Sequence, residues 1–102
     1  TRGARPRWFL ATILLPPTSD EQLPGELIQE MVAACASVGA SLIGGHTEVT
    51  PSVTRPIVAG TMLGTLPAPN GRILRSADAQ PGDSLVLTRG IAIEGPAVRG
   101  GG

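Results

Sequence analysis

The residues with the most chemical potential follow one another directly in the chain: Gly44, Gly45, His46, Thr47 and Glu48. Two glycines remove side chains, so a phosphate could come close to backbone N–H groups at this point. The next three residues offer an imidazole, a hydroxyl and a carboxylate. The same pattern also suits a glycine-containing bulge whose polar residues are merely solvated. The sequence therefore predicts either a ligand-binding loop or a plain bulge, and both readings stay open.

Catalysis by these residues alone is not expected. His46 and Glu48 would face the same side of an extended strand, as an acid–base pair requires. No nucleophile or third orienting group accompanies them, so we predict no catalytic residue. Hard cations such as magnesium prefer oxygen ligands, which makes the imidazole a poor partner for that ion and leaves the metal ligands undefined. Cys35, the one cysteine, is predicted to be a small core residue.

Composition excludes several classes of function. The chain has 102 residues, eight arginines and no lysine, eight acidic residues and two aromatic residues. Nucleic-acid binding needs a basic face or stacking rings, so we predict none. The apolar run from Trp8 to Leu15 is far shorter than a membrane span. A single cysteine cannot form an internal disulfide, so the cytoplasm is the default location. Charged residues make up only 16%, which suggests that a partner covers some apolar surface.

The elements that position the glycine segment begin with a strand over Trp8–Leu15. It is apolar at both parities, with one set facing each way: Trp8, Leu10 and Leu14 against Phe9, Ala11, Ile13 and Leu15. Such a strand is covered on both faces. Pro16 and Pro17 end it, because proline cannot continue a hydrogen-bond ladder.

A helix is predicted next. Ser19 and Gln22 fit a capping box, and Gly39 is a natural C-terminal stop. One apolar stripe follows the helical period: Leu27, Met31, Cys35 and Val38.

Further strands are predicted over Ala40–Ile43, Arg55–Leu66 and Ser84–Thr88, with turns at Asn70–Gly71 and Pro81–Gly82. One helix cannot cover both faces of such a sheet. The predicted fold is therefore α/β or α+β, a mixed sheet with the helix on one face. A second copy of the chain is the simplest cover for the other face.

Four segments resemble the aminoimidazole ribonucleotide synthetase superfamily, in particular its hydrogenase maturation branch: "GARPRWFLATILLP", "GASLIGGHTEVTP", "RPIVAGTMLG" and "AQPGDSLVLTRGIAIEG". The resemblance covers nearly all of residues 3 to 97. It implies two α/β domains, binding of ATP and magnesium, and activation of a substrate oxygen by phosphoryl transfer. It also implies that the N-terminal domains of two subunits close their sheets into a shared β-barrel.

The resemblance implies domain boundaries and site residues as well. Residues 1–90 would be part of the N-terminal domain, and residues 91–102 the start of an absent C-terminal domain. The segment from Gly44 to Glu48 would contact the nucleotide, although the family often has Asp or Glu at the position of His46. The family's acidic magnesium motif and its second domain lie outside this chain.

We therefore expect an incomplete nucleotide-binding and dimerisation domain that has no catalytic activity alone. One alternative is an ATP- and magnesium-binding module that another chain completes for phosphoryl transfer. The other is an interaction module without a ligand.

Overall fold

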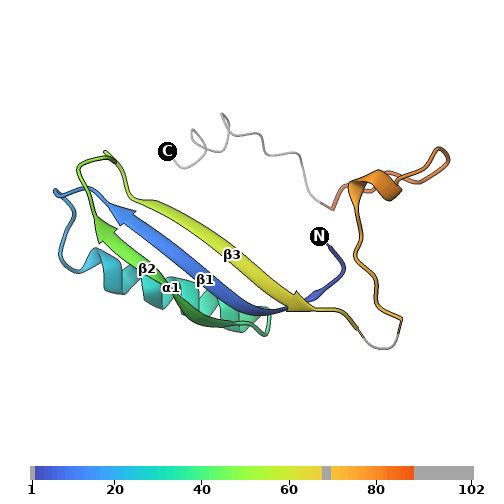
Figure 1. The fold of residues 1–102 in the computed structure, drawn as a ribbon, viewed down its shortest axis with the longest axis horizontal. Helices are drawn as coiled ribbons and strands as arrows, with labels where there is room; N and C mark the ends of the chain where they lie inside the picture. Colours follow the sequence, from blue (N-terminus) through green and yellow to red (C-terminus); the bar gives the residue numbers. More distant parts are fainter. Residues whose placement is uncertain (1, 68–69, 89–102) are drawn as a thin grey trace.

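The computed structural model describes residues 2–67 and 70–88. In chain order its elements are the strand β1 (Arg5–Leu15), the helix α1 (Leu23–Ser37), the strands β2 (Ser41–Val49) and β3 (Ile57–Thr65), and the short 3-10 helix η1 (Ser76–Asp78) (Figure 1). The strands form one sheet in the order β2-β1-β3, with β1 parallel to β2 and antiparallel to β3. This confirms a mixed sheet with one helix.

The helix α1 connects the two parallel strands and packs mainly against β2. Two adjacent parallel strands need such a crossover connection, because a tight turn reverses the chain direction and so joins only antiparallel strands. Figure 1 shows α1 running along β2 and β1 on one side of the sheet. The single helix therefore covers one face only.

The central strand β1 separates a covered face from an open one. Its odd-numbered residues Ala11, Ile13 and Leu15 are buried, whereas Trp8 at an even position is 39% exposed. Successive strand residues point to opposite faces, so the burial pattern confirms the predicted alternation.

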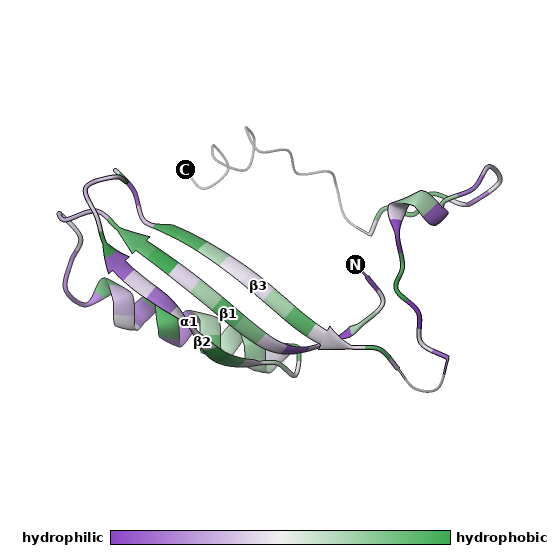
Figure 2. Cartoon of the chain, in the orientation of Figure 1, coloured by the Kyte–Doolittle hydropathy of each residue, from purple (hydrophilic) through white to green (hydrophobic). Residues whose placement is uncertain are grey.

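The open face continues onto β3. Leu63 lies opposite Trp8, and Ile57 lies opposite Leu14. Directly opposed residues share a face, and both β3 side chains are 46% exposed. Figure 2 shows apolar residues along most of β1 and β3. We call this surface the open face, and its apolar members are Trp8, Leu10, Leu14, Ile57 and Leu63.

The strand β2 extends further than the sequence predicts. It was expected to stop at Ile43, but it continues through both glycines to Val49. Phe9 pairs with Leu42 while Leu10 pairs with Gly44, so Ile43 is the extra residue of a bulge. The expectation that the backbone forms a loop after Ile43 is therefore wrong: it is a strand with a bulge, and ligand binding by this segment stays a prediction. Pairing with β1 keeps Gly44 and Gly45 in the strand, although glycine has a low strand propensity.

The predicted capping box is also wrong. The helix begins at Leu23 with Gln22 as its N-cap, and no side chain caps it. Pro24 lies in the first turn, where a backbone N–H would have no partner within the helix. Proline favours this position, so the helix starts near Pro24 rather than at Ser19. The Asp20 Oδ1 atom instead accepts a 2.9 Å hydrogen bond from the Gln22 N–H.

The C-terminal stop of α1 is confirmed. Gly39 has φ +76°, a left-handed conformation that favours glycine. Its N–H donates to the Ala36 carbonyl at 3.1 Å, and the Ala40 N–H donates to the Cys35 carbonyl at 2.9 Å. This pair of bonds is a Schellman motif. Cys35 is buried, as predicted for a core residue.

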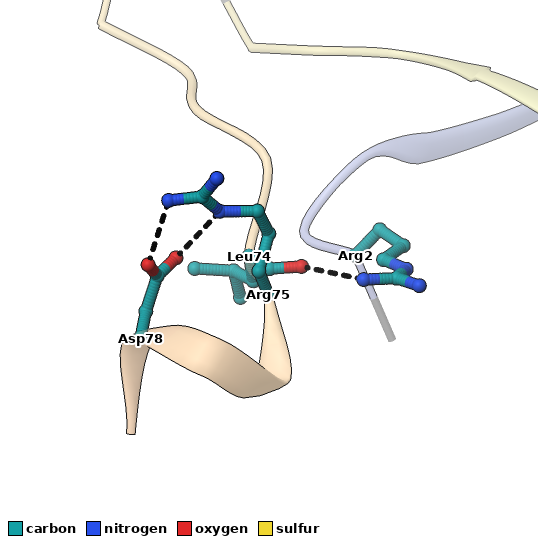
Figure 3. Close-up of polar contacts among 4 residues, drawn as sticks. All are labelled: Arg2, Leu74, Arg75 and Asp78. Atoms are coloured by element: carbon teal, nitrogen blue, oxygen red, sulfur yellow. Dashed lines mark hydrogen bonds and ion pairs between the residues drawn. The ribbon is translucent and has the colours of Figure 1, made fainter. Parts of the chain in front are cut away.

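Beyond β3 the chain leaves the sheet. The Gly71 N–H donates to the Pro67 carbonyl at 2.7 Å, which confirms a turn there, but no hairpin strand follows. Instead the Leu74 N–H donates to the Arg2 carbonyl at 2.9 Å. Figure 3 shows two further contacts of this region, from the Arg2 guanidinium to the Leu74 carbonyl and from Arg75 to Asp78.

The last predicted strand is absent from the described residues. A turn does form at Pro81–Gly82, where the Asp83 N–H donates to the Gln80 carbonyl at 3.1 Å. Residues 84–88 have no regular structure, and Leu85 is 100% exposed. A strand needs a neighbour, and no other described residue forms strand pairing with this segment. The predicted domain boundary at Gly90 and the segment 91–102 lie outside the described residues.

Candidate functional site

The five predicted site residues lie in the second half of β2, an edge strand of the sheet. Each stands opposite a residue of β1, in the pairs Gly44–Leu10, Gly45–Ala11, His46–Thr12, Thr47–Ile13 and Glu48–Leu14. Neighbouring residues therefore alternate between the two faces of the sheet. The structure brings the five together as one continuous stretch of extended backbone.

The two glycines have different physical causes. Gly45 has φ +142°, and a Cβ atom added there would overlap the carbonyl oxygen of Ala11. Close approach of β1 therefore explains this glycine without any ligand. A Cβ atom at Gly44 would meet only the Leu10 Cδ2 atom, at an ordinary 3.8 Å. Nothing in the described packing requires Gly44 to be a glycine.

A hollow of about 330 Å³ lies between α1 and this part of β2. Its polar rim includes His46 and Thr47, next to the glycine backbone. Its remaining lining is apolar: Ala11, Ile13, Ile28, Met31 and Leu42. A mostly apolar cavity of a few hundred cubic ångströms with a few polar groups is typical of small-molecule sites.

Two helix residues of this lining were not identified from the sequence as part of a site. Met31 was predicted only as core, and Ile28 lies beside the predicted apolar stripe. The available signal was their three-residue spacing, which places both on one side of α1. That spacing alone cannot distinguish core packing from the wall of a hollow.

His46 and Glu48 form a loose pair at the edge of the sheet. Their Nε2 and Oε2 atoms are 3.9 Å apart, and their side chains are 66% and 56% exposed. Within residues 2–67 and 70–88, no group of three or more His, Cys, Asp and Glu side chains could hold a metal ion. Glu48 is the only carboxylate among the five site residues. The donor set of one imidazole and one carboxylate therefore does not fit magnesium, which prefers oxygen ligands.

Across the same described ranges, no helix has both the length and the apolar character to cross a membrane.

Comparison with known proteins identifies the fold and the family. The family model for the AIR synthase related protein, N-terminal domain, matches residues 1–66. The chain is similar to HypE, a hydrogenase maturation protein, in its structure in complex with ATP: the TM-score is 0.65 with 25% identity, covering 78% of this chain and 24% of that one. A second structure, of the HypE–HypF complex, shows the same fold with a TM-score of 0.61 and 22% identity, covering 70% of this chain and 24% of that one.

Two curated relatives are similar in sequence. One is a selenide, water dikinase of Geobacter metallireducens, 32% identical over 95% of this chain and 28% of the relative. The other is a phosphoribosylformylglycinamidine cyclo-ligase of Syntrophus aciditrophicus, 33% identical over 92% of this chain and 26% of the relative. The chain thus spans about a quarter of the length of either relative. With the family model covering β1, α1, β2 and β3, this chain belongs to the AIR synthase related family and corresponds to its N-terminal domain.

Proposed function

We propose that this chain is a nucleotide-binding and dimerisation domain that has no catalytic activity alone. The observation that carries the proposal is the hollow beside Gly44, Gly45, His46 and Thr47. Support comes from HypE, a protein of similar fold whose structure contains ATP.

Different residues of the hollow would contact the base and the phosphates of a nucleotide. The apolar wall of the hollow, including Ile28 and Leu42, suits the flat face of a base. The absent side chain at Gly44 leaves room for a phosphate near the backbone. Thr47, opposite Ile13, lies on the face of the sheet that the hollow occupies and supplies a hydroxyl that can donate to phosphate oxygens. His46, opposite Thr12, points its imidazole to the other face. Transfer of a phosphoryl group needs more charged groups than this segment offers, which is why we propose binding without turnover.

Dimerisation is proposed through the open face. Its apolar side chains are partly exposed, and α1 lies on the opposite side of the sheet. A second copy applying the same face would bury both surfaces and close the two sheets toward each other. The cytoplasm is proposed as the location, because the sole cysteine is free and buried in the core.

Calorimetric titration with ATP tests the nucleotide proposal. We expect saturable binding that Thr47→Val weakens by about tenfold, as the loss of one or two polar contacts predicts. Glu30→Gln is the matched control, since Glu30 is exposed on α1 outside the hollow lining. Absence of heat at millimolar ATP, with or without divalent metal ions, would overturn the proposal.

A second candidate function is an interaction module without a ligand, favoured by the partial exposure of the open face. The same titration separates the two candidates. A chain that dimerises but binds no nucleotide would support the interaction module.

A further inference from the structure

We infer that two copies of the chain associate by antiparallel pairing of β3 with the β3 of the second copy, which joins the three strands of each copy into one sheet. This inference rests on the proposed dimerisation and specifies the strand edge that mediates it.

The two edge strands of the sheet differ in their protection against pairing. On β2, the bulge at Ile43 and the charged side chain of Glu48 both disfavour an added strand. On β3, all nine residues pair with β1 in unbroken order, and none of them is charged or a proline. Within residues 2–67 and 70–88, no strand pairs with the outer edge of β3, the side away from β1. This edge therefore lacks the features that usually prevent edge-to-edge association.

The strand β3 has unpaired backbone and exposed side chains along its whole length. Its nine residues exceed the usual strand length of about five or six. Every second residue of an edge strand directs its N–H and C=O groups away from its neighbour. All nine residues are exposed, including Val58 and Met62 at 44% each on the face that carries α1. A contact through the open face alone would leave these two side chains uncovered, whereas a paired strand lies beside them.

The sequence of β3 fits a second copy of itself. A two-fold axis perpendicular to the sheet gives antiparallel strands, and through the middle of β3 it places Thr61 opposite its own counterpart. In this register each larger side chain lies opposite a smaller one, and such cross-strand pairs are the unit of sheet stabilisation. The opposed pairs are Val58–Gly64, Ala59–Leu63 and Gly60–Met62.

Pairing at this edge also agrees with the proposed use of the open face. An axis perpendicular to the sheet does not exchange its faces, so both open faces lie on the same side of the joined sheet. The twist and closure of such a sheet turn them toward each other. Ile57 and Leu63 belong to the open face and to β3, so the edge and the face form one continuous interface.

Crosslinking tests the register. In the inferred dimer the Thr61 Cα atoms are about 4.5–5.5 Å apart, within the range that a disulfide spans. Thr61→Cys should therefore form a covalent dimer at least about tenfold faster than Ala59→Cys, whose two copies would be about 13 Å apart along the strands. Ala59→Cys is the matched control, because it lies on the same face of the same strand. The wild type, whose Cys35 is buried, should not crosslink.

Hydrogen exchange of the wild-type chain gives a second measurement that needs no substitution. The β3 amides that point away from β1 should exchange about tenfold more slowly at high protein concentration than at low concentration, because pairing gives them acceptors. The outer amides of β2 in the same sample are the control and should exchange equally fast at both concentrations.

The outcomes distinguish this inference from the proposed function. A dimer in which the two cysteine variants crosslink equally, or in which the β3 amides gain no protection, would overturn edge pairing and leave dimerisation standing. A chain that stays monomeric at every concentration would overturn both. Nucleotide binding is measured separately by calorimetry, so its absence would leave the edge pairing intact.

Discussion

The two faces of the sheet carry similar side chains but have different surroundings. On the covered face, Ile13 and Leu15 of β1 are almost completely buried, at 2% and 1% exposure. On the open face, Leu63 of β3 stays 46% exposed although it is as apolar as they are. The difference comes from α1, which packs on one face only and mainly against β2. Burial is therefore complete at the centre of the covered face, whereas β3 stays exposed on both faces, with Val58 opposite Ile13 at 44% and Leu63 at 46%.

This contrast separates apolar residues that are buried within the chain from apolar residues that remain partly exposed. Complete burial of a Leu or Ile side chain contributes about 1.5–3 kcal/mol of stabilising free energy. The partly exposed side chains of the open face would gain part of this free energy if a second surface covered them. Substitutions on the two faces should consequently affect different equilibria, folding on one side and association on the other.

The largest expected effect belongs to the covered face. Ile13→Ala should lower the free energy of unfolding by about 2–5 kcal/mol, because it leaves a cavity in the core. Leu14→Ala, the neighbouring position on the open face, is the matched comparison. Its cost should be smaller in dilute protein and should grow with protein concentration as the dimer forms. Urea denaturation at several concentrations measures both, and equal costs at every concentration would contradict the distinction between the faces.

A charged substitution on the open face tests whether this face mediates self-association. Leu63→Lys should weaken self-association by about a hundredfold, because the ammonium group would lose its hydration in an apolar interface. Gln29→Lys adds the same charge on the exposed side of α1 and should leave association unchanged. Sedimentation velocity reports the dimer fraction. A wild-type chain that stays monomeric at high concentration would contradict the closed barrel.

The smallest expected effect concerns the fit of β2 against β1. Gly45→Ala should cost about 1–3 kcal/mol of stability, because its φ of +142° and the nearby Ala11 carbonyl disfavour a side chain. Gly25→Ala is the control within α1, where an added Cβ meets nothing within 4 Å. It should stabilise the chain by about 0.5–1 kcal/mol. Thermal unfolding compares the two, and a neutral Gly45→Ala would show that β2 can shift outward.

Features that depend on local pattern could be predicted from the sequence. The two sets of residues along β1 could be assigned because successive strand residues point to opposite faces. Gly39 could be placed as a stop because a helix end favours a left-handed glycine. The helical spacing of the apolar stripe predicted that Cys35 lies in the core. All of these signals come from residues that are close together in the sequence.

Features that depend on distant partners could not be predicted. The strand β2 continues past Ile43 because β1 hydrogen-bonds to it, which overrides the weak strand preference of glycine. The segment 84–88 has strand-like residues but pairs with no strand among residues 2–67 and 70–88. The hollow at the candidate site likewise depends on where α1 lies over β2, which no local pattern specifies.

The central position of β1 also has a consequence for the order in which the chain is made. The ribosome releases β1 before either of its neighbours, and the strand that pairs with its second edge, β3, ends at Thr65. Until that residue emerges, a segment that is apolar on both sides has an unpaired backbone edge, which favours pairing with foreign strands. Nascent chains that stall before β3 should therefore aggregate or depend on chaperones, whereas chains released after it can complete the sheet.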